Sequence, residues 1–89
     1  MSASELETVV ERLRIAHEHA DGEAEERIER LLERADGALE DGRTLDHSAL
    51  ARMTRTLSEL AEDADGDAEE AIEAAKDAIS SYREGVPGA

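Results

Sequence analysis

The sequence predicts an all-α protein in which four helices form an up-down bundle. Three observations lead to this fold class. Apolar residues recur three and four positions apart along the chain, which is the spacing of amphipathic helices. Glycine-containing breaks divide this pattern into four segments, and no stretch alternates long enough to indicate a strand. The two halves of the chain are also similar to each other, which favours two tandem antiparallel hairpins.

The first helix is expected over residues 4–19. Ser4 and Glu7 have the spacing of a capping box, in which each side chain accepts a hydrogen bond from the backbone N–H of the other residue. Ile15 lies almost opposite the apolar stripe, where it is either an ordinary exposed residue or part of a dimer interface. The stripe contains Leu6, Val9, Val10, Leu13, Ala16 and Ala20.

The second helix is expected over residues 23–39, and Gly42 is suited to its C-terminal end. Its apolar stripe contains Ala24, Ile28, Leu31, Leu32, Ala35 and Leu39. Because a short loop makes consecutive helices antiparallel neighbours, the first two helices form a predicted hairpin over about residues 4–40.

The third helix is expected over residues 47–63, with Asp46 as its N-cap. Leu45 precedes this cap and is placed to pack on Leu50 as a hydrophobic staple. The apolar stripe contains Leu50, Met53, Leu57, Leu60, Ala61 and Ala64.

The fourth helix is expected over residues 67–83 and completes a second hairpin over about residues 46–84. Its apolar stripe contains Ala68, Ala71, Ile72, Ala75, Ala78, Ile79 and Tyr82. Gly85, Pro87 and Gly88 follow it, and these residues do not continue a helix readily.

A ten-residue stretch occurs twice. "ADGEAEERIE" covers residues 20–29 and "ADGDAEEAIE" covers residues 64–73, with eight identical positions. We interpret each copy as the turn of a hairpin followed by a helix start, because acidic residues are stabilised at the positive end of a helix. Duplication of one hairpin and convergence on the same local signals both explain the repeat, and we favour duplication.

At 89 residues, the chain is expected to form a single domain over residues 1–89. Sixteen of its hydrophobic residues are alanine and Tyr82 is its only aromatic residue, so the predicted core is thin. Small domains bury a low fraction of their surface. We therefore predict a homodimer that completes the core.

The chain carries a net charge of −14. Such a surface repels itself at ordinary ionic strength, whereas the Debye length falls to about 3 Å at about 1 M salt. We therefore predict a protein of a high-salt cytoplasm whose fold requires salt. The acidity argues against binding to nucleic acid or to an anionic membrane. The chain contains no cysteine and no apolar run long enough for a signal or membrane segment, so a soluble, cytoplasmic protein is expected.

The acidic turns raise the question of a metal site. The stretch from Asp63 fails the pattern of an EF-hand, because Ala68 stands where glycine is needed and Ala74 where the bidentate glutamate is needed. Both turns are nevertheless expected at one end of the bundle, where several side chains could attract a divalent cation. The candidates are His17, Asp21, Asp63, Asp65 and Asp67. We expect no bound cofactor.

Three arginines form a row on the second helix, at positions 27, 30 and 34. This row could hold an anion or an acidic partner. The alternative is structural: Glu23 precedes Arg27 by four residues and Glu26 precedes Arg30 by four, which is the favourable order for ion pairs within a helix. We favour the structural interpretation.

The second half of the chain resembles an uncharacterised family of small acidic helical proteins from halophilic archaea. The resemblance covers Leu45–Val86 and is carried by three motifs, Asp46-His47, Leu50-Ala51-Arg52 and Tyr82-Arg83-Glu84, together with Leu57. The first half resembles the family only as an acidic amphipathic hairpin. The resemblance implies a domain of unknown function without an assigned activity.

These motifs contain three candidates for docking a partner, His47, Arg52 and Arg83. The structural alternative is that Asp46 caps a helix while Tyr82 fills the same end of the core. Neither a nucleophile turn between strand and helix nor a glycine-rich phosphate loop occurs. We therefore predict a non-enzymatic interaction or structural module, with divalent-cation binding at the acidic turns as the alternative.

Overall fold

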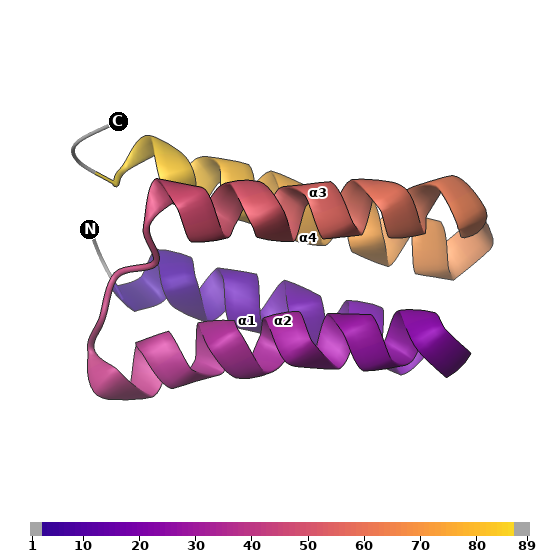
Figure 1. The fold of residues 1–89 in the computed structure, drawn as a ribbon, viewed down its shortest axis with the longest axis horizontal. Coiled ribbons are helices and arrows are strands. Elements are labelled where there is room, and N and C mark those ends of the chain that lie inside the picture. Colours follow the sequence, from indigo (N-terminus) through magenta and orange to yellow (C-terminus); the bar gives the residue numbers. More distant parts are fainter. Residues whose placement is uncertain (1–2, 87–89) are drawn as a thin grey trace.

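The computed structural model describes residues 3–86, with side chains from residue 5 onward. These residues form four helices and no strand: α1 (Ala3–His19), α2 (Gly22–Asp41), α3 (His47–Asp63) and α4 (Gly66–Glu84). The helices run up and down with short connections, as Figure 1 shows. The predicted all-α bundle of two tandem hairpins is confirmed.

The bundle has two different ends (Figure 1). The α1–α2 and α3–α4 turns lie together at one end, which we call the turn end. The start of α1, the α2–α3 connection and the end of α4 lie at the opposite end, which we call the loop end. As a result, α2 and α3 run antiparallel to each other between the two ends.

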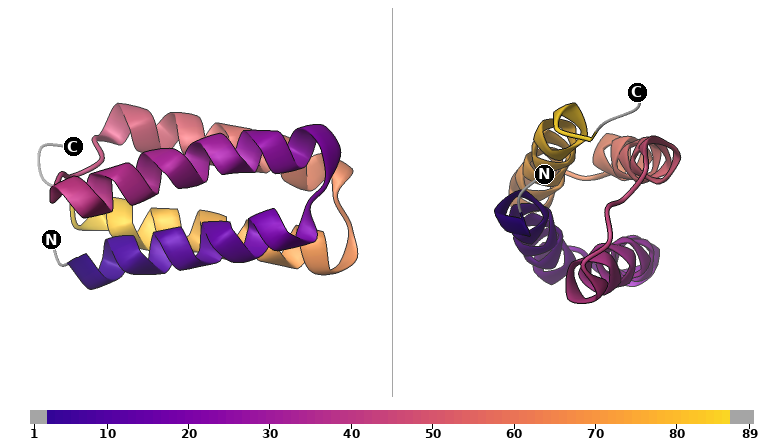
Figure 2. Two further views of the ribbon diagram at one scale, coloured as in Figure 1. Left: turned by 90° about the horizontal axis from the view of Figure 1, so that it is seen from below. Right: turned by 90° about the vertical axis from the view of Figure 1, so that its left-hand side faces the viewer.

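The four helices are not equally packed around the bundle. α1 packs along both α2 and α4, and α4 packs along α3, whereas α2 and α3 make few contacts. The end-on view in Figure 2 shows these two helices on the same side of the bundle. Of the four neighbouring helix pairs, this one makes the fewest contacts. α2 is therefore held mainly by α1.

The core reflects this arrangement. It is formed mainly by α1, α3 and α4, and α2 contributes only Ile28, Ala35 and Ala38 as fully buried residues. Leu31, Leu32 and Leu39 of α2 are only half-buried at the edge of the core. The apolar stripe predicted for α2 therefore exists, but α3 lies too far away to cover it completely.

The helix ends follow the sequence signals in most places. α3 spans the predicted residues, and the Asp46 side chain caps it by accepting a hydrogen bond of 2.7 Å from the Ala49 N–H. Leu45 and Leu50 are both buried in the core, as the predicted staple requires. Gly42 ends α2 in the left-handed conformation, with φ of +69°.

Two expectations for α1 were wrong. The helix already includes Ala3, so Ser4 lies inside it rather than at its cap. Ala3 is a strong helix former, and this allows the helix to begin earlier than the polar signal indicates. Ile15 is half-buried and packs against the core, although the helical period places it opposite the apolar stripe.

The repeated "ADG" turns have nearly the same backbone geometry. Asp21 and Asp65 are both extended, with φ of −145° and −147°. The glycines that follow them, Gly22 and Gly66, have φ of +60° and +57°, a conformation that is accessible to glycine at little cost. The repeat is therefore a structural turn that occurs twice.

Candidate functional site

The two turns and the facing ends of α2 and α3 form an acidic groove. Its lining includes one ion pair, between Arg27 of α2 and Glu59 of α3, with Nη2 and Oε1 3.0 Å apart. Five further carboxylates line it and form no ion pair with the described residues. They are Asp21, Glu23, Glu62, Asp63 and Asp65, and we call them the acidic end.

This groove contains only part of the predicted metal cluster. Asp21, Asp63 and Asp65 line it, whereas Asp67 and His17 do not. His17 instead faces Glu25 on α2, with 3.9 Å between Nε2 and Oε2. Within residues 3–86, no group of three or more histidine, aspartate or glutamate side chains is arranged to hold a metal ion.

The loop end carries a hydrogen-bond network around His47. The His47 ring bonds the Val86 carbonyl oxygen through Nε2 at 3.1 Å and accepts a bond of 3.2 Å from Arg83 Nε through Nδ1. These two contacts fit the tautomer with its proton on Nε2, because a carbonyl can only accept a hydrogen bond and Arg83 Nε can only donate one. His47 and Arg83 thus connect the start of α3 to the end of α4.

Tyr82 makes a second connection at the same end. Its side chain is 1% exposed and its hydroxyl accepts a hydrogen bond of 3.2 Å from the buried Leu45 N–H. This bond satisfies a backbone group that would otherwise be buried without a partner. The predicted placement of Asp46 and Tyr82 at one end of the bundle is confirmed, and His47 and Arg83 also form structural contacts there.

Arg52, the third docking candidate, lies apart from this network. Its guanidinium donates to Ser48 Oγ at 2.9 Å and its side chain is exposed. Arg52 lies three residues after Ala49 and seven before Glu59, so all three are on one side of α3. Glu59 is paired with α2, and this side of α3 is therefore the one that faces α2.

The arginine row on α2 does not form the predicted pairs within its helix. Arg27 reaches across to Glu59 on α3 instead of pairing with Glu23. Arg30 and Arg34 make no hydrogen bond or ion pair with the described residues, and Arg30 therefore does not pair with Glu26. The structural interpretation favoured from the sequence is wrong for these pairs: Arg27 pairs with Glu59 on α3, and Arg30 lines a groove between α2 and α3.

A second groove between α2 and α3, at the loop end, is lined by these free arginines. Arg30 and Arg34 line it together with Arg43, which pairs with Asp41 at 3.2 Å. Two carboxylates, Glu33 and Asp46, also line it. We call Arg30, Arg34 and the neighbouring Arg52 the basic end, because these three cations form no ion pair with the described residues.

We use the name α2–α3 face for the surface along which α2 and α3 lie side by side, including the groove at each end. On α2 it runs from Glu23 through Arg27 to Arg34, and on α3 from Arg52 to Asp63. Along this face, carboxylates gather at the turn end, whereas arginines without an ion pair lie nearer the loop end, together with Glu33 and Asp46. Sequence reasoning identified the arginine row but missed this distribution, which requires the antiparallel placement of α3 beside α2.

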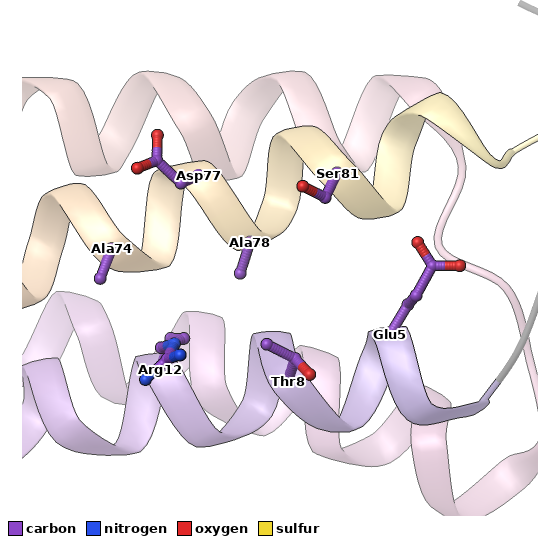
Figure 3. A pocket seen from close by; sticks show the side chains of 7 residues that line it. All are labelled: Glu5, Thr8, Arg12, Ala74, Asp77, Ala78 and Ser81. Carbon is purple, nitrogen blue, oxygen red and sulfur yellow. The ribbon is translucent and has the colours of Figure 1, made fainter.

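The opposite side of the bundle has a groove of another kind. It runs between α1 and α4 and is lined by small residues of α4, including Ala74, Ala78 and Ser81 (Figure 3). The methyl groups of Ala74 and Ala78 point toward α1, beside Thr8 and Arg12 (Figure 3). The two helices are packed closely here, and the groove is a shallow seam between them.

With this geometry established, comparison with known proteins adds one assignment. The chain matches the family model described as "Family of unknown function (DUF7553)" over residues 1–85. The chain belongs to this family. No curated protein and no solved structure matches it. Membership in DUF7553 confirms the expectation of an uncharacterised family and extends it from the second hairpin to both, but it supplies no activity and no site residue.

None of the helices in residues 3–86 combines the length and the apolar character needed to cross a membrane.

Proposed function

We propose that the chain is a small non-enzymatic protein–protein interaction module that binds through its α2–α3 face. The observation that carries this proposal is the incomplete contact between α2 and α3. Leu31 remains half-buried on α2, and Arg30 and Arg34 have no partner among the described residues. A helix with an incompletely covered apolar stripe and free guanidinium groups beside it has the composition of a protein interface, in which apolar groups and arginine are enriched.

The non-enzymatic role rests on the sequence. The chain has no cysteine, no glycine-rich phosphate loop and no nucleophile turn. We propose no cation-binding function, because no specific observation favours it. The acidic end contains many carboxylates, but a chain with this net charge is expected to have acidic turns in any case.

Cross-linking in intact cells tests the interaction. The wild-type chain is expected to cross-link to protein, and the double substitution Arg34→Glu/Arg52→Glu on the α2–α3 face is expected to abolish this. A matched control, Arg12→Glu/Arg14→Glu, makes the same change in charge on α1 and is expected to cross-link like the wild type. Absence of any cross-linked protein with the wild-type chain would show that the proposed function is wrong.

We also propose that the chain works in the cytoplasm of a halophilic archaeon. Its net charge of −14 on 89 residues supports this setting, because molar salt screens the repulsion within such a surface. The melting temperature is expected to rise as KCl is increased from low to molar concentration. A melting temperature that stays constant across this range would contradict the proposal.

A further inference from the structure

The groove between α2 and α3 at the loop end combines apolar residues with arginine side chains. Leu45 and Ala49 line it, and both are only 6% exposed, so they form its floor. Arg30 and Arg34 of α2 also line it and are exposed, four residues apart on one side of the helix. Arg43 joins them from the connection to α3. The groove has a volume of about 530 Å³, which is within the range of ligand sites.

The charges in this lining leave the two α2 arginines without a partner. Arg43 is paired with Asp41, 3.2 Å away. The Asp46 carboxylate caps α3 through its 2.7 Å hydrogen bond from the Ala49 N–H. Glu33 is the remaining carboxylate of the lining, and it forms no ion pair with the described residues. Two free guanidinium groups therefore accompany one free carboxylate, which is a local excess of positive charge on a chain with a net charge of −14.

A glycine in the middle of α2 keeps this groove open. Gly37 lines the groove and lies three residues after Arg34, on the same side of the helix. Glycine inside a helix is less favourable than alanine. Yet Gly37 does not have a positive φ, and a Cβ there would come no closer than an ordinary contact of 3.9 Å, to Nη2 of Arg43. Neither the backbone nor the packing requires glycine here, and such a departure from local preference is typical of a functional site.

We propose that this groove binds an acidic segment of another protein, whose carboxylates are held by Arg30 and Arg34. This inference rests on the proposed function and names the chemistry of its partner. Guanidinium groups bind carboxylates through two parallel hydrogen bonds. At roughly 1.5 Å per residue, the two arginines are about 6 Å apart along α2, which matches two carboxylates that are two residues apart in an extended segment. The apolar floor beneath a charged edge has the layout of a protein interface.

The surroundings of the groove favour a short protein segment over a nucleic acid. A nucleic acid needs a continuous positive surface for its phosphates, whereas the acidic end of the same face carries five carboxylates without an ion pair. A segment of a few residues fits within the groove. At about 1 M salt the Debye length is roughly 3 Å, so the acidic surface farther away repels such a segment little and the groups in contact decide binding.

Nuclear magnetic resonance of the isotope-labelled full-length protein in molar KCl tests this site, with end-blocked hexaglutamate as the probe. The wild type is expected to show saturable shift changes confined to amides around the groove, including those of Arg34 and Gly37. Arg30→Gln/Arg34→Gln is expected to bind the probe about tenfold more weakly or less, because both guanidinium contacts are lost. The matched control Arg12→Gln/Arg14→Gln makes the same change on α1 and is expected to bind like the wild type.

Filling the groove gives a second test that leaves every charge in place. Gly37→Leu puts a large side chain into the groove and replaces a poor helix former with a good one. Its melting temperature is therefore expected not to fall, while its binding of hexaglutamate is expected to weaken about tenfold or more, because the space beside Arg34 is occupied. Circular dichroism verifies that each variant is folded, and the arginine variant decides the question if Gly37→Leu is not.

Two further ligands separate an acidic segment from other occupants. Neutral hexaglutamine and inorganic phosphate are each expected to bind about tenfold more weakly than hexaglutamate or less, because neither offers paired carboxylates on a peptide. Absence of saturable shifts with the wild type, equal binding of hexaglutamine or phosphate, or undiminished binding in a folded groove variant would each overturn the proposal.

The two proposals can fail separately. If hexaglutamate does not bind but Arg34→Glu/Arg52→Glu still abolishes cross-linking in cells, the acidic segment is wrong and the interaction function stands. If hexaglutamate does not bind and the wild type cross-links to nothing, both are wrong.

Discussion

The two long sides of the bundle differ in how their helices meet. On one side, α1 and α4 pack along their length, and the residues at their seam include the small Ala74 and Ala78 (Figure 3). On the other side, α2 and α3 carry long charged residues such as Arg27 and Glu59 where they face each other, and they make few contacts. Small side chains allow two helices to approach, whereas long charged ones keep them apart and keep their heads in water.

The two hairpins therefore have a complete contact with each other on only one side of the bundle. α1 and α4 come from different hairpins and hold them together through a shared core. α2 and α3 are also from different hairpins but are linked by the short connection and one ion pair among the described residues. The bundle is therefore packed more completely on the α1–α4 side than on the α2–α3 side.

The largest loss of stability is expected at Leu13 of α1, and Leu31 of α2 provides the comparison from the other side. Leu13 of α1 is fully buried, and Leu13→Ala is expected to lower the free energy of unfolding by about 3 kcal/mol through lost burial and a residual cavity. Leu31 of α2 is half-buried, so Leu31→Ala is expected to cost about 1 kcal/mol. Urea titration in molar KCl, at a protein concentration low enough for the monomer, measures both. Equal losses would contradict the difference between the two sides.

A smaller effect is expected at Tyr82 of α4, whose hydroxyl is hydrogen-bonded to the segment between α2 and α3. Tyr82→Phe removes the acceptor for the Leu45 N–H and leaves this amide buried without a partner. The expected loss is about 2 kcal/mol, most of it the desolvation of the amide. Thermal unfolding measures the loss, and hydrogen exchange of the Leu45 amide is expected to become faster. Unchanged exchange would show that the hydroxyl is not the partner of this amide.

Helix capping gives a comparison between two aspartates that precede helices. Asp46 accepts a hydrogen bond from the Ala49 N–H, so Asp46→Ala is expected to cost about 1 kcal/mol. Asp65 occupies the equivalent position before α4 but its side chain makes no cap bond. Asp65→Ala is therefore expected to cost only a few tenths of a kcal/mol. Urea titrations of the two variants test this, and a larger loss for Asp65→Ala would reverse the assignment.

The smallest effect is expected for the ion pair that links α2 to α3. The Arg27 and Glu59 side chains are 33% and 54% exposed, and exposed ion pairs contribute little. A double-mutant cycle with Arg27→Ala and Glu59→Ala is expected to give a coupling energy of about 0.5 kcal/mol in molar KCl. A coupling above about 2 kcal/mol would mean that this pair holds the α2–α3 side together and that the side is not open.

The sequence was sufficient for the elements and for their order. The helical period, the Asp46 cap and the Gly42 terminator are local signals, and each acts within one or two turns of chain. The same holds for the two "ADG" turns, whose glycines require a left-handed conformation that few other residues adopt at low cost. The prediction of Ser4 as the N-cap was wrong, because a good capping pattern does not prevent a helix from already including the preceding alanine.

The packing of α2 could not be predicted in the same way. Its stripe has the width of a core-facing helix, yet Leu31, Leu32 and Leu39 are only half-buried. How closely α3 approaches is decided by side chains on both helices, and a stripe on one helix does not contain that information. The periodic pattern likewise predicts pairs within α2 for the arginine row, because it cannot show that Glu59 of α3 offers Arg27 a partner.

The difference between the two long sides of the bundle is tested most directly by native-state hydrogen exchange in molar KCl. α1 packs along both α2 and α4, whereas α2 is held mainly by α1. Backbone amides in the middle of α2 are therefore predicted to exchange faster than those in the middle of α1. Equal protection of the two helices would contradict the difference between the two sides.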